Sequence, residues 1–328
     1  MAATLHPPDL SLERARALIT RAINKAEDIG MRGAIAVVGA SGTLVSASRM
    51  DHGGAGGMAR ARSKAWIAAT QQIPSLVHLQ RMGMVAPPMV SGFVACSPEA
   101  VFPGAGGMPV SEDGWVIAGI AASGAGIGPF VAYPGADPRK LIADGRPANG
   151  EDLLVHYALG LPYEGQHGDD VERWTTAYGP VPEDPGLGMA EPPAASRQDE
   201  RVWALGMADR ALAAARRREL RVAVSVVDRR GDPIQQDAME GAPSAGAEIS
   251  QATATAAAAF ACPSAELTDR FAPPRMLDRL AAVLPFTILA LPGAVPIVGD
   301  GGVVAAVGVG GPPPEVCAEI AAEARDGG

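Results

Sequence analysis

A group of charged residues and glycines near the N-terminal end has the composition of an anion-binding site. The candidate ligand-binding residues are Arg49, Asp51, His52, Gly53, Gly54, Gly56, Gly57, Arg60 and Lys64. A glycine loop that enters a helix exposes backbone N–H groups at the positive end of the helix dipole, and this favours an anionic ligand. Arg60 and Lys64 are four residues apart, so they share one face of the expected helix. The pattern predicts a carboxylate site here; the alternative is an ordinary loop with solvated charges.

Histidines supply the candidate metal ligands. His52 lies beside the glycine loop, and His156 and His167 lie in a polar middle segment that also contains Glu164 and Asp169. Histidines together with carboxylates can bind a divalent metal and activate water. The spacing matches no compact ligand motif, so a structural or surface role is the alternative for this segment. No arrangement of residues identifies a catalytic nucleophile.

The glycine loop belongs to a segment that occurs twice, at residues 32–75 and 221–264. Each copy has a short β-branched run, a turn at a glycine, a returning strand, a glycine-containing loop and an alanine-rich helix. The expected helices are Met58–Gln72 and Ala247–Ala261, which end before a Pro-Ser pair. The same order of elements in both copies indicates an internal duplication.

The remaining elements follow the same plan in each half. The predicted helices are Leu10–Ile29 (with Ser11 as its N-cap), Leu76–Gly83, Glu151–Leu159, Glu200–Arg217 and Pro314–Ala324. The predicted strands are Ala34–Val38, Thr43–Ala47, Val90–Ala95 and Trp115–Ala122 in copy one, and Val222–Val227, Pro233–Gln236, Phe286–Leu291 and Val303–Val309 in copy two. We therefore expect three parts: copy one at 1–125, a Pro/Gly-rich inserted connector at 126–197, and copy two at 198–328.

Composition excludes several classes of function. The net charge of −9 and an aromatic content of 4% argue against a nucleic-acid-binding protein. The three cysteines form no CxxC pair, so neither a disulfide framework nor a cysteine zinc site is indicated. The most apolar tract, Ala281–Val298, is interrupted by prolines and predicts buried strands, not a membrane span. The N-terminal residues lack the apolar core of a signal peptide, so a soluble cytoplasmic protein without membrane partners is expected.

Several motifs of the duplicated segment resemble a known family. They are AIAVVGASGTLVSASRMD and the later Lys64-Ala65 in copy one, and AVSVVDRRGDPI and LPGAVPIVGDGGVVAAVGVGG in copy two. Each half resembles the haem-degrading domain family typified by GlcG and HbpS, which also occurs as the C-terminal domain of PduO. The resemblance implies an α/β (α+β) fold, with two profilin-like domains whose antiparallel sheets are flanked by helices. It also implies symmetric assembly into a homo-oligomer, and we expect the two copies to pack as an intrachain pseudo-dimer.

The resemblance also suggests a ligand. Members of the family bind haem or related tetrapyrroles, which implies haem as a cofactor, together with haem-linked redox or degrading activity. Arg60 and Lys64 would then pair with the propionates, and His52 would offer an axial nitrogen. Copy two has Ile249 and Thr253 at the positions of these two cations, so it is expected to act mainly as scaffold.

Two other functions stay open at this point. The chain could be an enzyme on a small carboxylate or aromatic metabolite that binds in a cleft between the copies, roofed by the middle segment. It could also be a purely structural assembly partner. Whether the chain is an enzyme is therefore left open by the residues.

Overall fold

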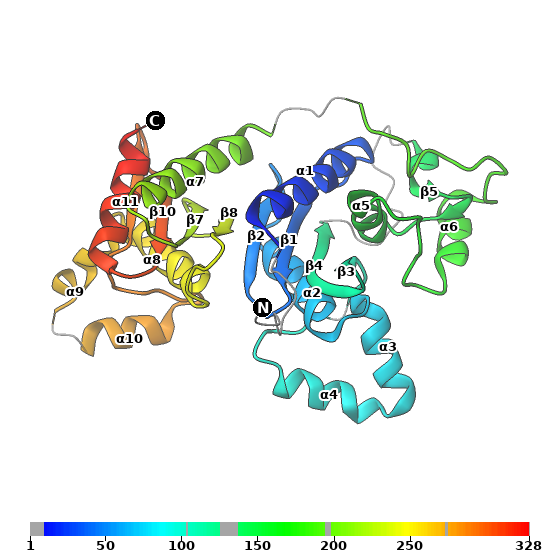
Figure 1. Cartoon of the computed structure of the whole chain (residues 1–328), viewed down its shortest axis with the longest axis horizontal. Helices are drawn as coiled ribbons and strands as arrows, with labels where there is room; N and C mark the ends of the chain where they lie inside the picture. The colour runs from blue at the N-terminus through cyan, green and yellow to red at the C-terminus, as the bar shows by residue number, and fades with distance from the viewer. Residues whose placement is uncertain (1–9, 103, 125–136, 194–197, 273–274, 328) are drawn as a thin grey trace, which may run out of the picture. The chain divides into compact units, whose positions relative to one another are not determined.

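The computed structural model describes residues 10–102, 104–124, 137–193, 198–272 and 275–327. The chain divides into two compact units, Met1–Arg197 and Gln198–Gly328. Each unit contains an antiparallel sheet with helices on both faces (Figure 1). The expected α+β class, with two copies of one architecture, is confirmed.

Unit one begins with a helix and a hairpin and ends with the middle segment. Its helices are α1 (Leu12–Asp28), α2 (Gly57–Gln71), α3 (Ser75–Val85), α4 (Pro87–Cys96), η1 (Pro138–Leu141), α5 (Gly150–Leu159) and α6 (Asp170–Tyr178). Its strands are β1 (Gly33–Gly39), β2 (Leu44–Arg49), β3 (Gly107–Glu112), β4 (Trp115–Gly124), β5 (Ile142–Ala143) and β6 (Arg146–Pro147). The first four strands lie in the order β3-β4-β1-β2, and the last two form a small hairpin of their own.

The sheet of unit one separates two layers of helices, because successive strand residues point to opposite faces. Ile35, Val37 and Ile120 belong to a core cluster that includes residues of α1 and α5. On the other face, a Cβ placed on Gly119 would lie 2.2 Å from the Ala65 carbonyl oxygen of α2. The backbone of α2 therefore approaches β4 more closely than any side chain at Gly119 would allow.

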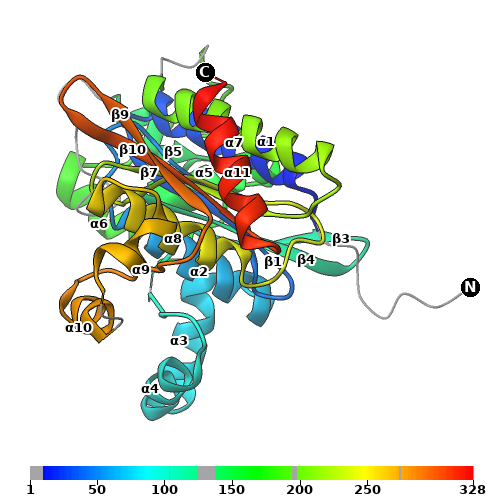
Figure 2. The same ribbon diagram turned by 90° about the vertical axis from the view of Figure 1, so that its left-hand side faces the viewer.

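Unit two has the same plan. Its helices are α7 (Asp199–Arg217), α8 (Gly246–Phe260), η2 (Ser264–Glu266), α9 (Leu267–Arg270), α10 (Arg275–Val283) and α11 (Pro314–Asp326). Its strands are β7 (Ala223–Asp228), β8 (Pro233–Ala238), β9 (Ala294–Gly299) and β10 (Gly302–Gly310), and they lie in the order β8-β7-β10-β9. α8 covers one face of this sheet, and α7 and α11 lie along the other (Figure 2).

The two hairpins agree in detail. Gly42 and Gly231, at the two turns, both have a φ of 86°, a left-handed conformation that favours glycine. The pairing register shifts after Val37 in one copy and after Val226 in the other. The duplication inferred from the sequence is thus present in the backbone as well.

The Pro-Ser pairs that end both alanine-rich helices have a common structural role. The Ser75 hydroxyl accepts a hydrogen bond from the Gly107 N–H at 3.1 Å, and the Ser264 hydroxyl accepts one from the Ala294 N–H at 3.1 Å. Each serine therefore ties the end of a helix to the start of the strand β3 or β9.

Two predicted strands are wrong. Residues 90–95 lie in the helix α4, which begins with Pro87 and Pro88, and proline is favoured in the first turn of a helix. Residues 286–291 form no strand, and they lead irregularly into β9. Both segments are short apolar runs, whose hydrophobicity alone does not distinguish a helix from a strand or a buried loop.

The described part of the middle segment is integrated into unit one. Leu153, Leu154 and Trp174 are buried in the same core cluster as α1 and β1. α5 packs against α1 and β4, just as α11 packs against α7 and β10 in unit two. α5 therefore takes the place that the closing helix has in the second copy.

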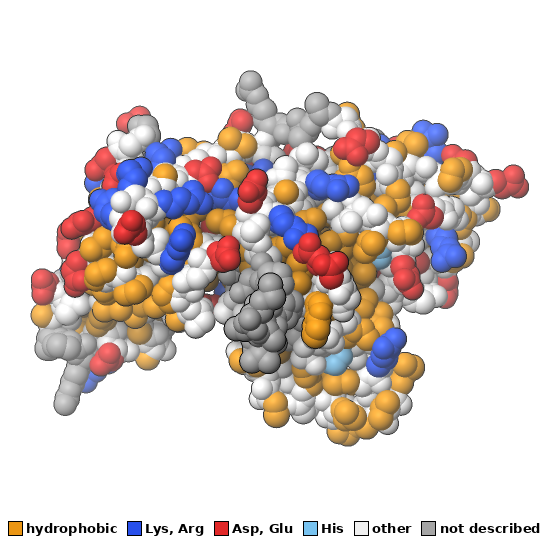
Figure 3. Space-filling model, viewed as in Figure 1, with side chains coloured by type: hydrophobic (Ala, Val, Ile, Leu, Met, Phe, Trp, Pro, Cys, Tyr) orange, Lys and Arg blue, Asp and Glu red, His pale blue; other side chains and the backbone are white. Residues whose placement is uncertain are grey.

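Some surfaces remain apolar. Met84, Val85, Met89 and Val94 are exposed on α3 and α4, where hydrophobic side chains gather at the lower end of the view in Figure 3. Among the described residues, no helix combines the length and the apolar character that a membrane crossing requires.

Candidate functional site

The glycine loop leads directly into α2. The Gly53 N–H donates to the Met50 carbonyl at 2.9 Å, and the Gly57 N–H donates to the Gly54 carbonyl at 2.9 Å, so the loop consists of two tight turns. His52, at the first turn, has a φ of 62° and is exposed, as are residues 54–56. α2 begins at Gly57 without a side-chain cap and without an acidic residue in its first turn. This helix start therefore has no side-chain cap and no negative charge that would oppose an anion at the exposed loop.

Arg60 lies beside this helix start and packs over the loop. Its Nε donates to the Ser123 hydroxyl at 3.2 Å, and its guanidinium carbon lies 5.9 Å from the centre of the Phe102 ring. A Cβ placed on Gly56 would lie 2.8 Å from Arg60 Nη1. Glycine at position 56 therefore lets the guanidinium lie against the loop.

Lys64 does not share the exposure of Arg60. Its side chain is fully buried, and its ammonium donates to the Glu151 carboxylate at 2.7 Å and to the Ala105 carbonyl at 2.8 Å. Burial lowers the pKa of Lys64, and the charge of Glu151 opposes this shift. The expectation that Lys64 is a surface cation on the face of Arg60 is wrong, because α5 covers it.

The other two charged candidates lie at the end of β2. Arg49 is paired with Ala34 in the sheet register and is only 7% exposed. Asp51 follows it at the turn and is half-buried. Both side chains have interaction partners within the fold, so they contribute to the structure beneath the loop.

The structure does not bring the candidate metal ligands together. Within the described ranges, no group of three or more His, Cys, Asp or Glu side chains could hold a metal ion. His52 is exposed at the glycine loop, whereas His156 is buried on α5. Burial lowers the pKa of His167, which is half-buried.

A buried polar network that the sequence pattern does not reveal joins the middle segment to β3 and α3. Asp152, fully buried, accepts hydrogen bonds from the Gly106 N–H at 2.7 Å and from the Gln166 side-chain amide at 2.6 Å. Gln166 in turn accepts one from the Leu76 N–H at 2.9 Å. Burial raises the pKa of Asp152, and the donated hydrogen bonds lower it. The only sequence signal for this network is the polar composition of the segment.

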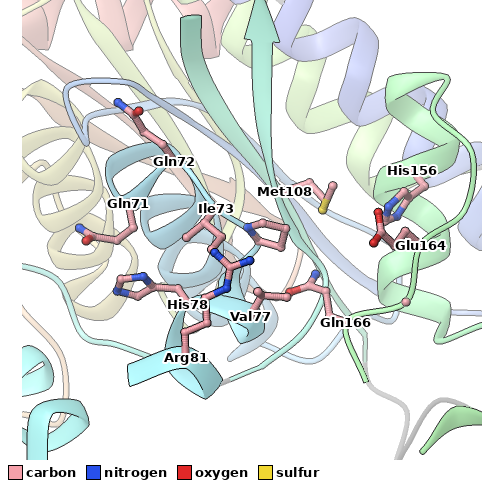
Figure 4. Close-up of a pocket in the computed structure, with 12 residues that line it drawn as sticks. Gln71, Gln72, Ile73, Val77, His78, Arg81, Met108, His156, Glu164 and Gln166 are labelled. Atoms are coloured by element: carbon pink, nitrogen blue, oxygen red, sulfur yellow. The ribbon is translucent and has the colours of Figure 1, made fainter. Parts of the chain in front are cut away.

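Beside this network lies a pocket of about 720 Å³, drawn in Figure 4. Its walls come from the end of α2, from α3, from β3, from α5 and from the segment after α5. His78, Arg81, His156 and Glu164 supply its titratable side chains. The pocket lies wholly within unit one.

The model of one protein family matches both units. This family is described as haem degrading protein HbpS-like, and the match covers residues 10–127 and 200–326. The chain belongs to the HbpS-like family. The resemblance inferred from the motifs is thereby confirmed.

The solved structures similar to the chain each match about two fifths of it. A double mutant of HbpS from Streptomyces reticuli is 27% identical, and the match covers 42% of this chain and 97% of that one, with a TM-score of 0.35. The ORFY protein of Klebsiella pneumoniae is 28% identical over 38% of this chain and 87% of that one, with a TM-score of 0.36. A complex of PduOC with haem is 23% identical over 40% of this chain and 94% of that one, with a TM-score of 0.36. No match was found among curated proteins.

The two HbpS-like copies differ at the helix start. α8 of unit two also begins without a side-chain cap, but its first turn contains the acidic Glu248. Ile249 stands where unit one has Arg60, and the Thr253 hydroxyl donates to the Ile249 carbonyl at 2.8 Å. At its helix start, unit two therefore has a negative charge and lacks the basic side chain that Arg60 provides in unit one.

Proposed function

We propose that the protein binds haem, or a related anionic tetrapyrrole, at the glycine loop and the start of α2 in unit one. The observation that carries this proposal is the uncapped start of α2 behind the exposed residues 54–56, with Arg60 packed against this loop. Membership of the HbpS-like family, whose description is haem degrading, makes haem the first ligand to test.

The residues present fit the carboxylate end of such a ligand. The open space around Gly54 and the N–H groups at the start of α2 leave room for a propionate, and Arg60 supplies its countercharge. His52 would offer a nitrogen from the exposed turn, while Lys64 acts through Glu151 to hold α5 in place. Haem would supply an iron centre capable of electron exchange, which is the basis of the proposed redox or degrading activity.

Titration of the purified chain with haemin, followed near the Soret band, tests this function. Arg60→Ala should weaken binding about tenfold or more, because a charge-assisted hydrogen bond contributes roughly 1.5–3 kcal/mol. Arg146→Ala is the matched control, since Arg146 is an exposed arginine on β6 in the same unit. An Arg60→Ala variant with the affinity of the wild type would place the haem elsewhere.

A second variant tests the role of His52. Asn tolerates the left-handed backbone of this residue and lacks the imidazole, so His52→Asn removes the nitrogen without straining the turn. We expect a shifted Soret band if His52 ligates the iron. An unchanged spectrum with unchanged affinity would show that His52 does not take part in binding, and the proposed site would then consist of Arg60 and the helix start.

Unit two is proposed to act as scaffold. With Glu248 in the first turn of α8, an anion would be repelled at the position that corresponds to the site of unit one. Glu248→Ala should therefore leave haemin affinity unchanged, whereas loss of binding in this variant would assign a site to unit two. Assembly into a homo-oligomer and the pseudo-dimer arrangement of the units stay predictions, and sedimentation analysis would test the first.

A further inference from the structure

The pocket of about 720 Å³ in unit one has the size of a site for a small organic molecule. Apolar side chains line it, among them Pro74 just before α3, Val77 of α3 and Met108 of β3. Polar and charged groups converge on it from α3 and from the segment that follows α5 (Figure 4). Its lining includes neither the glycine loop nor Arg60, so a ligand in this pocket is independent of the proposed haem site.

One wall carries a buried imidazole with a fixed tautomer. His156 is 2% exposed, and its Nδ1 lies 2.7 Å from the Asp152 carbonyl oxygen. A carbonyl oxygen only accepts hydrogen bonds, so Nδ1 carries a proton, and in the tautomer with one ring proton the lone pair is on Nε2. Nε2 has no hydrogen-bond partner among the described residues. Because His156 lines the pocket, its free acceptor is available to a ligand there.

Glu164 also lines the pocket, and it lies on the same side of the view as His156 in Figure 4. It is exposed, on the segment between α5 and α6. This wall therefore presents two acceptors, an imidazole nitrogen and a carboxylate, which together suit a hydroxyl or an ammonium group.

A cation lies on the other side. Arg81 of α3 is exposed and forms no ion pair with the described residues, and in Figure 4 its guanidinium points toward Ile73 and lies apart from Glu164. The neighbouring His78 has a buried Nε2 without a partner among the described residues, and burial lowers its pKa, so it is neutral near pH 7. Arg81 therefore supplies the positive charge on the α3 side of the pocket.

The walls are held together without a ligand. Gln166 accepts from the Leu76 N–H of α3 at 2.9 Å and donates to Asp152 of α5 at 2.6 Å. Its side-chain amide also donates to the Gly107 carbonyl of β3 at 3.3 Å. One residue thus links three of the elements that form the pocket, and a pre-formed site needs little ordering when a ligand binds.

We propose that this pocket binds a small organic acid and contacts both ends of that ligand. The carboxylate pairs with Arg81, the hydrocarbon part lies on Val77 and Met108, and a remote hydroxyl or ammonium group donates to His156 Nε2 and Glu164. The ligand class is therefore an ω-hydroxy or an ω-amino carboxylate.

Calorimetric titration of the full chain with three matched series tests this proposal: ω-hydroxy carboxylates, ω-amino carboxylates and unsubstituted carboxylates of the same lengths. At one chain length we expect a substituted acid to bind at least about tenfold more tightly than its unsubstituted counterpart. Arg81→Ala should weaken its binding about tenfold or more. The matched control is Gln80→Ala, an exposed neighbour on the same helix outside the pocket.

Two further variants test the acceptor wall. His156→Phe keeps a ring of similar size and should abolish the preference over the unsubstituted acid. Because His156 is buried, its replacement could disturb the fold, so Glu164→Gln on the exposed segment provides a second test. This variant should weaken the binding of an ω-amino acid more than that of an ω-hydroxy acid. The proposal is overturned if no acid of the three series binds, if all series bind equally, or if Arg81→Ala binds like the wild type.

Discussion

Asp170 is a buried carboxyl group whose charge costs stability. It is 7% exposed, and its Oδ1 has no hydrogen-bond partner among the described residues. Burial, together with the nearby charge of Asp152, raises the pKa of Asp170 to about 6. In the unfolded state the carboxyl has its ordinary pKa of 3.8. At a pH between these two values, Asp170 is therefore protonated in the folded state and ionised in the unfolded state.

This shift determines a pH dependence of stability. Between about pH 4 and pH 6 the folded chain binds more protons than the unfolded chain, so the free energy of unfolding falls as the pH rises through this window. Asp170→Asn removes the titration and should be more stable than the wild type above pH 6 by about 1–2 kcal/mol, after allowing for partial access of water. Urea unfolding at several pH values measures the difference.

The control for this prediction is the adjacent residue. Asp169 is exposed and pairs with Arg173 at 2.8 Å, so Asp169→Asn should change stability by less than about 1 kcal/mol at every pH. An Asp170→Asn variant that follows the wild type across the whole pH range would show that the carboxyl is not protonated in the fold.

Removing either partner of the Lys64–Glu151 pair should lower the stability of the fold, by unequal amounts. Lys64 is fully buried, whereas the Glu151 side chain is 25% exposed and also accepts from the Gly124 N–H at 2.7 Å. Glu151→Gln leaves a buried ammonium without its countercharge and should cost about 3 kcal/mol or more. Lys64→Met leaves a carboxylate that water can reach and should cost about 1–2 kcal/mol. Chemical unfolding measures both losses, and equal losses would contradict this assignment.

At the scale of elements, small residues set the distance between helix and sheet. The Cβ that alanine would add at Gly119 lies 2.2 Å from the Ala65 carbonyl oxygen, and that at Gly308 lies 2.2 Å from the Ser250 carbonyl oxygen. In both units the backbone of the alanine-rich helix therefore packs onto a strand of the main sheet, β4 in unit one and β10 in unit two. This contact explains why alanine predominates on these helices, since larger side chains would push the layers apart.

Gly119→Ala should therefore destabilise unit one by about 2 kcal/mol or more, because the obstacle is backbone and α2 must shift. Gly92→Ala is the control: position 92 lies in α4 with nothing within 4 Å of its Cβ, and alanine is the better helix former. Thermal unfolding should place the control at or above the wild type. A Gly119→Ala variant as stable as the control would exclude this close packing.

At the scale of the whole molecule, the described part of the middle segment completes the core of unit one. α5 covers Lys64 and contributes buried Leu153, and Trp174 of α6 is 1% exposed in the same cluster. Unit two needs no such segment, because its own α11 follows β10 directly.

A comparison of fragments tests this difference. Residues 1–197 and 198–328 should each unfold cooperatively when expressed alone. Residues 1–125 should lack a cooperative transition, because α1 then covers its face of the sheet without α5 and Trp174. Circular dichroism during heating shows whether each fragment has a cooperative unfolding transition. A fragment 1–125 that melts like 1–197 would make the middle segment dispensable for folding.

The amino-acid sequence by itself determined the repeated architecture. The side-chain periodicity of α1, its Ser11 cap and the glycine turns at Gly42 and Gly231 are local signals, so these elements were predicted near their observed bounds. The family was evident from the same repeated motifs. The exposed glycine loop and the start of α2 were also predicted, because a helix start depends on neighbouring residues.

Only the tertiary structure decided which charged residues are available to a ligand. Arg60 and Lys64 look equivalent on a helical face, yet Glu151, far along the chain, covers one of them and leaves the other open. The pocket of Arg81, His156 and Glu164 arises in the same way, from three segments that share no local pattern. Burial and charge pairing depend on contacts between distant residues, and these contacts exist only once the chain is folded.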